Sequence, residues 1–254
     1  MKVLPARFRF VFIGVFLAAT SPALLRMPAT ASEVKKPRIV LSPQQKEAIK
    51  KEVLKSLIKK AEEGDKDYQL ILGNMYFEGE GVKKDYQLAF ELFLKAAIQG
   101  KIEAQYAVGS LYYMGKGVKH DVRSAVQWLK KAASQEHIRA QYFLGAIYYR
   151  GEEDGEPDYE QAREWFTRCS KNGDPDAMTG MGNLWEYGKG VDKSPSAAAD
   201  WYYQAGVTWL KDFNSRDDAL ASLDMIGRAY PDSELWFKLR EAIYSVPPAK
   251  KENK

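Results

Sequence analysis

Few residues of this chain have the types and spacing that catalysis needs. Ser56 and Lys59 match S-x-x-K, a motif in which a serine nucleophile works beside a lysine in penicillin-recognising enzymes. The K-T-G and S-D-N segments that would complete such a site do not occur. The match also lies in a lysine-rich amphipathic stretch, where it arises easily by chance. For these reasons, an envelope hydrolase, or a penicillin- or glycan-binding protein, is kept only as the alternative hypothesis. We assign no catalytic residues and expect the chain not to be an enzyme.

Metal and redox chemistry are also poorly supported. The chain has two histidines, His120 and His137, and they occupy non-equivalent places. Because a metal site needs three or four converging ligands, no metal and no cofactor are predicted. Cys169 is the single cysteine, so no internal disulfide is possible. It is best explained as a small buried residue.

Two kinds of loop suggest ion binding at first sight. Gly-x-Gly pairs occur at Gly79/Gly81, Gly115/Gly117 and Gly188/Gly190. A dinucleotide-binding fingerprint follows a strand and opens a helix, whereas these loops join two helices, which favours a structural role. The acidic loop 152–158 has the charge to attract a cation or a basic partner. It lacks the spacing of a calcium-binding loop, so a solvated loop is preferred.

These loops recur in a repeat of 36 residues. Four columns keep this step, and they are Gly73/Gly109/Gly145/Gly182, Gly79/Gly115/Gly151/Gly188, Tyr76/Tyr112/Tyr148/Trp185 and Leu92/Trp128/Trp165/Trp201. One extra residue enters between Gly151 and Asp158, within a loop. Each unit shows two apolar faces at helical spacing, separated by the glycine loop, so it predicts a pair of helices.

Individual residues of the unit have mechanical roles. Capping residues begin the second helix at Asp85, Asp121, Asp158 and Ser194. Gly79 and its copies end the first helix, where a left-handed residue is preferred. Gly73 and its copies lie in mid-helix, where glycine costs about 1 kcal/mol relative to alanine. We therefore expect a neighbouring helix to approach closely there.

The residues from Ala61 to Ala97 resemble a Sel1-like repeat almost end to end: A-E-E-G-D, then L-G, Y-F-E-G-E-G-V, D-Y and K-A-A. The repeats would occupy 61–96, 97–132, 133–169 and 170–206. The resemblance implies an all-α fold, a right-handed α-solenoid related to tetratricopeptide repeats. Glu153 departs from the pattern at the second loop glycine, and Lys101 and His137 replace a capping aspartate. These departures put local loop shape in doubt but not the architecture.

Helical caps are predicted at both ends of the repeats. One helix spans 42–63, and residues 207–245 form a C-terminal cap whose first part resembles a tetratricopeptide motif. Solenoids need such ends to cover their last apolar faces. Residues 32–41 and 246–254 are predicted to be a disordered linker and tail.

The first 31 residues have the pattern of an export signal. A basic start is followed by the apolar run 10–19 and by an A-x-A site that ends at Ala31. We expect cleavage after Ala31 and a periplasmic or secreted protein; an uncleaved N-terminal membrane anchor is the alternative. The signal removes four basic residues and no acidic one, which leaves 34 of the 38 Lys and Arg against 34 Asp and Glu. A balanced chain disfavours nucleic-acid binding.

Alignment of the mid-helix glycine with tetratricopeptide repeats predicts which residues line the concave face. These residues are Leu70, Asn74, Phe77, Tyr106, Ser110, Tyr113, Tyr142, Ala146, Tyr149, Thr179, Asn183 and Tyr187. Exposed tyrosines often anchor interfaces, although the same side chains can pack between adjacent repeats. We therefore expect a non-catalytic scaffold or adaptor that binds a protein or peptide on this face and is exported, as the N-terminal signal indicates; the resemblance implies a role in assembling or regulating an envelope complex.

Overall fold

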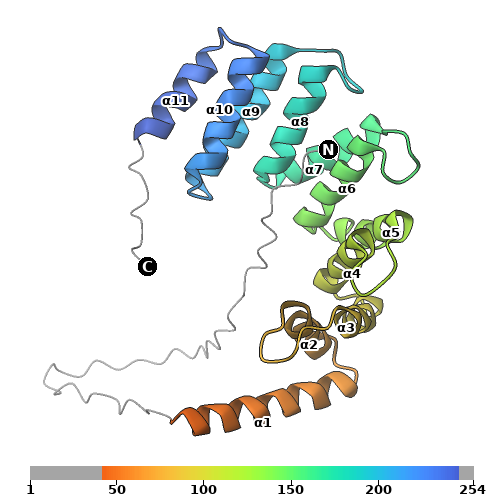
Figure 1. Ribbon diagram of the computed structural model, residues 1–254. Coiled ribbons are helices and arrows are strands. Elements are labelled where there is room, and N and C mark those ends of the chain that lie inside the picture. Colours follow the sequence, from red (N-terminus) through yellow and green to blue (C-terminus); the bar gives the residue numbers. More distant parts are fainter. Residues whose placement is uncertain (1–41, 246–254) are drawn as a thin grey trace, which may run out of the picture. The chain divides into compact units, whose positions relative to one another are not determined.

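All regular structure in residues 42–245 is helical in the computed structural model, which describes this part of the chain (Figure 1). The eleven helices of this part are α1 (Pro43–Glu62), α2 (Lys66–Glu78), α3 (Tyr86–Ile98), α4 (Ile102–Met114), α5 (Val122–Ala133), α6 (Ile138–Arg150), α7 (Tyr159–Lys171), α8 (Pro175–Tyr187), α9 (Pro195–Lys211), α10 (Arg216–Ala229) and α11 (Glu234–Ser245). The predicted signal 1–31, linker 32–41 and tail 246–254 lie outside the described residues.

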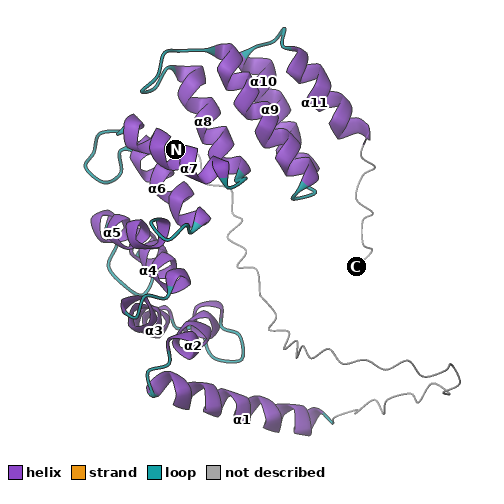
Figure 2. Ribbon diagram, turned by 180° about the vertical axis from the view of Figure 1, so that it is seen from behind, coloured by secondary structure: helices purple, strands orange, loops and turns teal. Residues whose placement is uncertain are grey.

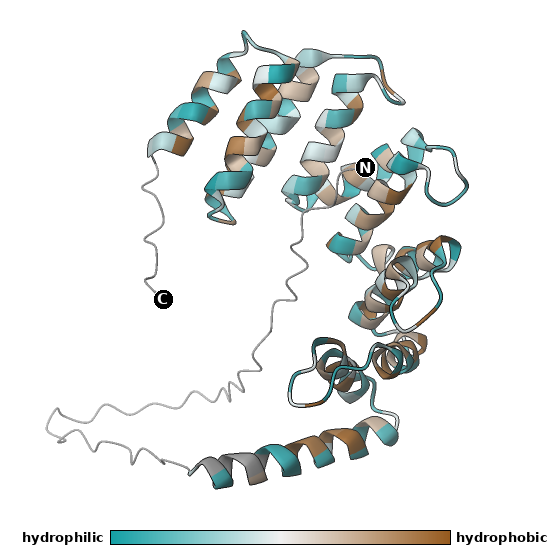
Figure 3. Cartoon of the chain, in the orientation of Figure 1, coloured by the Kyte–Doolittle hydropathy of each residue, from teal (hydrophilic) through white to brown (hydrophobic). Residues whose placement is uncertain are grey.

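The helices stack in chain order, and each contacts the helix before it and the helix after it (Figures 1 and 2). The first helices of the four repeats are α2, α4, α6 and α8, and the second helices are α3, α5, α7 and α9. Apolar residues lie where helices meet, and the loops are mostly hydrophilic (Figure 3). Such an array is held together by contacts between neighbours, so each junction between repeats matters individually.

Capping determines where the helices begin. Asp85 Oδ1 accepts a hydrogen bond from the backbone N–H of Leu88 at 3.0 Å, and Asp121 and Asp158 cap α5 and α7 in the same way. His137 takes over the role of the missing aspartate, because its Nδ1 accepts from Ala140 N–H at 3.2 Å. Lys101 makes no such bond. Its Nζ lies 2.9 Å from Asp67 Oδ1 of the preceding repeat instead.

The mid-helix glycines allow the two helices of a pair to approach closely. A Cβ atom on Gly109 would lie 2.8 Å from Leu129 Cγ, and one on Gly182 would lie 2.3 Å from Tyr202 Cε1. Gly73 and Gly145 face phenylalanine rings at similar distances. The predicted close approach is confirmed, and the approaching element is the second helix of the same repeat.

The second loop glycine packs against the preceding repeat. Gly117 has a φ of +72°, and a Cβ there would lie 2.0 Å from the carbonyl oxygen of Tyr86. A Cβ on Gly190 would lie 2.7 Å from Tyr159 Cβ. Gly117 and Gly190 therefore let the loops of the second and fourth repeats rest on the start of the previous second helix, whereas Gly81 of the first repeat meets only Met75 of its own helix pair. The third loop, with Glu153 in place of this glycine, is one residue longer.

The C-terminal cap joins the array through a long α9. This helix continues to Lys211, and α10 and α11 pack on it. A Cβ on Gly206 would lie 2.5 Å from Leu239 Cδ2, so α11 comes as close to α9 as the two helices of a repeat do to each other.

Candidate protein-interaction surface

The residues considered for catalysis do not converge. Ser56 is exposed on α1, and Lys59 Nζ lies 3.8 Å from Glu63 Oε1. Cys169 is buried with its Sγ 3.3 Å from the carbonyl oxygen of Ile138, and burial raises the pKa of its thiol. Within residues 42–245, no three His, Cys, Asp or Glu side chains are placed to hold a metal ion.

The twelve predicted surface residues fall into three columns, counted from the mid-helix glycine. The column three residues before it contains Leu70, Tyr106, Tyr142 and Thr179. Tyr106 is only 5% exposed and stacks on the ring of His137 in the next repeat, with 4.6 Å between centroids. Burial raises the pKa of both Tyr106 and Tyr142. Tyr106 therefore lies in the junction with the next repeat and offers a partner little surface, whereas Tyr142 is half-buried, with its ring 6.1 Å from that of Phe166 in the same repeat.

The column one residue after the glycine is also mostly enclosed. Ser110 and Ala146 are buried, whereas Asn74 and Asn183 are half-buried. Asn183 Oδ1 lies 2.9 Å from the Tyr202 hydroxyl oxygen and shares with Glu186 the single proton that this hydroxyl donates, so the Asn183 carbonyl group faces the core.

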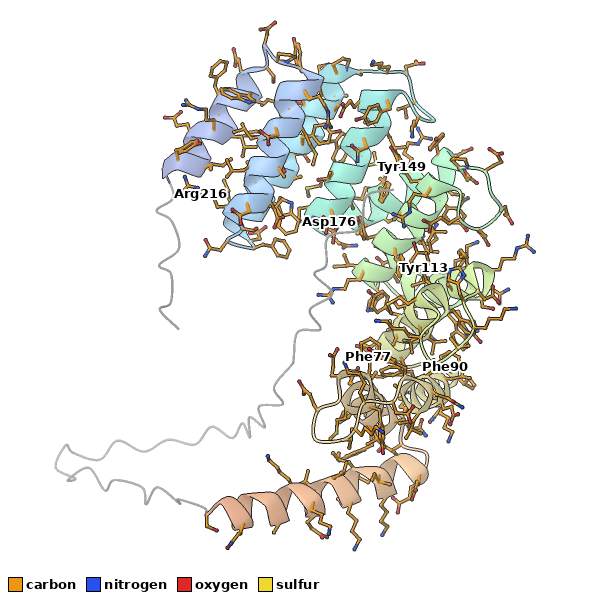
Figure 4. All side chains as sticks on the ribbon, viewed as in Figure 1. Phe77, Phe90, Tyr113, Tyr149, Asp176 and Arg216 are labelled. Atoms are coloured by element: carbon orange, nitrogen blue, oxygen red, sulfur yellow. The ribbon has the colours of Figure 1, made fainter. Side chains whose placement is uncertain are left out.

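The third column, four residues after the glycine, presents a partly exposed aromatic ring in each of the first three repeats. Phe77, Tyr113 and Tyr149 are half-buried and follow one another along the stack, one in each repeat (Figure 4). Each contacts a cation from the next repeat. These cations are Lys116, 5.7 Å from the Phe77 ring centroid; Arg150, whose Nη2 donates to the Tyr113 hydroxyl at 3.3 Å; and Lys189, 4.7 Å from the Tyr149 centroid. We call these six residues the aromatic–cation row.

Tyr187 stands one residue outside this column. Because the third repeat is longer by one, the position equivalent to Tyr149 is 186, which is glutamate. Tyr187 is 51% exposed, so it remains accessible beside the end of the row.

Glu186 forms a polar network in place of an aromatic contact. Arg228 of α10 donates to both of its carboxylate oxygens, at 2.8 and 3.0 Å, and the Tyr202 hydroxyl donates at 2.6 Å. Burial alone would raise the pKa of Glu186, but the bonds from Arg228 and Tyr202 outweigh it and lower that pKa. This network was not predicted, although Glu186 interrupts a column of aromatic residues that is evident in the sequence.

A ladder of glutamines was also missed. Gln69, Gln105 and Gln141 are buried, and the side-chain amide of each donates to a carbonyl oxygen eight residues earlier, at 3.1 to 3.3 Å. Gln99 and Gln135 donate to the side-chain oxygens of Gln69 and Gln105, at 2.8 Å each. The spacing of 36 residues between these glutamines could have indicated the ladder. It links α2 to α1 and links the first helices of the second and third repeats to the repeat before each.

The acidic loop of the third repeat is partly neutralised by nearby arginines. Asp154 Oδ1 lies 3.2 Å from Arg123 Nη2, and Glu152 Oε1 lies 2.6 Å from Arg150 Nε. These contacts favour a structural role for the loop over a cation site.

The family is established by sequence comparison. The Sel1 repeat model matches residues 67–101, 102–137, 138–174 and 175–206, which is more than half of the chain. The chain therefore belongs to the Sel1 repeat family, an all-α solenoid whose members are commonly protein-interaction scaffolds. The matches begin about six residues after the predicted repeat starts but cover the same four helix pairs.

Solved structures agree with this fold. A protective antigen of uropathogenic Escherichia coli matches with a TM-score of 0.65 and 29% identity, over 76% of this chain and 40% of that chain. A Sel1 repeat protein from Oxalobacter formigenes matches with a TM-score of 0.60 and 26% identity, over 78% and 82% of the two chains. The chain thus spans less than half of the first of these proteins. The search of curated proteins found no match. Of the described helices, none combines the length and apolar character that crossing a membrane requires.

Proposed function

We propose that this protein is an exported, non-catalytic adaptor that holds a segment of a partner protein along the aromatic–cation row. Export is proposed from the N-terminal sequence pattern, and a role in an envelope complex follows from it. Binding of a protein is the common activity of the Sel1 repeat family. The row gives that activity a location on this chain.

The observation that carries the proposal is the continuity of the row across three junctions. Each ring is fixed by a cation from the next repeat while part of its surface meets solvent. Tyrosine and phenylalanine supply large contact areas with little loss of side-chain entropy, and arginine adds directional hydrogen bonds. A preformed row also lowers the cost of ordering the surface on association.

Site-specific crosslinking tests the location. A photoreactive phenylalanine analogue placed at Tyr113 or Tyr149 in the full chain should form a covalent adduct with a partner in cells of the source organism. The same analogue at Tyr230, a 42% exposed tyrosine of the C-terminal cap, is the matched control and should give no such adduct.

Substitutions then test the energetic contribution. The variant Tyr113→Ser/Tyr149→Ser should lose the partner identified by crosslinking, with unchanged helicity by circular dichroism. Tyr230→Ser should retain it. Equal crosslinking from position 230, or full retention of the partner by the double variant, would show that the aromatic–cation row is not the binding site. We leave Tyr106 and Tyr142 unchanged in this test, because their burial would confound binding with stability.

A further inference from the structure

The last described helix, α11, has an exposed aromatic stripe. Its inner face buries Leu239 and Ile243 completely against α9 and α10. Its outer face carries Phe237 and Tyr244, which are 60% and 62% exposed. Residues seven apart lie on the same face of a helix, so the two rings belong to one stripe.

The stripe has no described element against it. A solenoid helix that no repeat covers usually presents a polar outer face. In the described part of the chain, α11 packs mainly on α9 and α10 (Figure 1). Two large, mostly exposed rings on the outer face of α11 therefore indicate a surface that another element covers.

Charged residues lie between the two rings. Arg240 and Glu241 are both exposed, and they occupy the middle of the stripe. The Arg240 guanidinium lies 5.6 Å from the Tyr244 ring centroid, and that of Arg216 lies 5.2 Å from it, so the ring is flanked by cations. Along the helix, the stripe therefore presents an aromatic, a basic, an acidic and an aromatic residue, in that order.

That order is self-complementary. If two α11 helices pair antiparallel about a two-fold axis between residues 240 and 241, position 237 of one faces position 244 of the other. Phe237 then meets Tyr244 of the second copy, and Arg240 meets Glu241 of the second copy, each twice. Isologous interfaces require this kind of self-complementary patch. Aromatic and opposite-charge contacts are both favourable across such a pair.

We propose that a second copy of this chain covers the stripe, forming a two-fold dimer through α11. The stripe is small, so association should be reversible, with a dissociation constant on the order of micromolar. The dimer is independent of the proposed partner surface, which lies on α2, α4 and α6.

Charge reversal tests both the occupant and the register. Sedimentation equilibrium of the full chain, over about 1 to 100 µM, should show a monomer–dimer equilibrium. Arg240→Glu alone, or Glu241→Arg alone, places like charges in contact and should weaken dimerisation at least about tenfold. The double variant Arg240→Glu/Glu241→Arg should restore it, and the two single variants should pair with each other. Lys95→Glu, at an exposed lysine of α3, is the matched control and should not change it.

Other results would overturn the proposal. A monomer at every concentration would mean that another occupant, such as residues 246–254 or a different protein, covers the stripe. If the dissociation constant of the dimer is unchanged by both charge reversals and by Phe237→Ser, the second copy binds to another surface. Helicity and the thermal midpoint of each variant establish that it is folded.

Discussion

The junctions among the Sel1 repeats differ from the junction between the fourth repeat and the C-terminal cap. In the first three repeats, Phe77, Tyr113 and Tyr149 contact a cation of the next repeat through a ring or a hydroxyl. In the fourth, Glu186 at the equivalent position contacts Arg228 through a bidentate ion pair.

A second column changes together with the first. Phe93, Leu129 and Phe166 pack against the mid-helix glycines of the first three repeats, and Tyr202 does so in the fourth. The added hydroxyl donates to Glu186. The position within the repeat therefore determines where a side chain lies. The neighbouring helix or repeat determines whether an aromatic or a charged residue is favourable there. Where α10 replaces a Sel1 repeat, the contact between an aromatic residue and a cation becomes an ion pair.

The largest expected effect comes from blocking a junction between repeats. In Gly117→Ala, the new methyl group would collide with the carbonyl oxygen of Tyr86, and the positive φ would add strain. We expect a loss of about 3 kcal/mol in the free energy of unfolding, measured by chemical denaturation. Gly155→Ala is the control, because Gly155 also has a positive φ but open space around it. Similar losses in both variants would show that the close contact is unimportant.

The junction with the cap should respond next most strongly. Arg228→Met leaves the carboxylate of Glu186 buried without its cation, which should cost about 2 kcal/mol, less than for a fully buried pair because Arg228 is half exposed. The lowered pKa of Glu186 means that this stabilisation is present above its ordinary value of 4.5 and is lost as pH falls through the lowered value. Thermal midpoints across pH should therefore converge for the two proteins in acid.

Lys238→Met provides a comparison for that variant. Lys238 pairs with Glu234 at 3.3 Å, but both side chains are mostly exposed, so its loss should change stability by less than about 0.5 kcal/mol. An Arg228 variant as stable as the Lys238 variant at neutral pH would contradict a structural role for the Glu186 network.

The smallest expected effects concern the glutamine ladder. Gln105→Met removes the bond to Ala97 and one of the two bonds that the Gln135 amide donates, the other going to the carbonyl oxygen of Lys131, which should cost about 1–2 kcal/mol. Gln141→Met removes the bonds to Ala133 and Glu136 but also a buried Oε1 that has no partner, and the fourth repeat already has Met178 at this place, so it should cost less. Thermal midpoints of the two variants measure the difference. A larger loss of stability in Gln141→Met than in Gln105→Met would contradict a stabilising role for the glutamine ladder.

Much of the fold was predictable because its signals are local and repeated. Asp85 and its equivalents cap helices through atoms three residues away, and Gly79 and its equivalents end helices by their own conformation. The family resemblance and the helix pairs were therefore confirmed. The candidate surface was less predictable. Ser110 and Tyr106 look like surface residues in sequence, yet both are buried, Tyr106 against the ring of His137.

The sequence by itself determined that four helix pairs follow one another at a step of 36 residues, because capping and hydrophobic spacing act within a few residues. Only the tertiary structure decided which tyrosines meet solvent, which glycines touch a neighbouring repeat and which residue pairs with Glu186. Each of these depends on two segments some 30 to 42 residues apart, as with Gln69 and Gln99 or Glu186 and Arg228. Burial and pairing between residues so far apart in the sequence depend on how the helices pack against one another. They cannot be deduced from the residue types that recur at one position of the repeat.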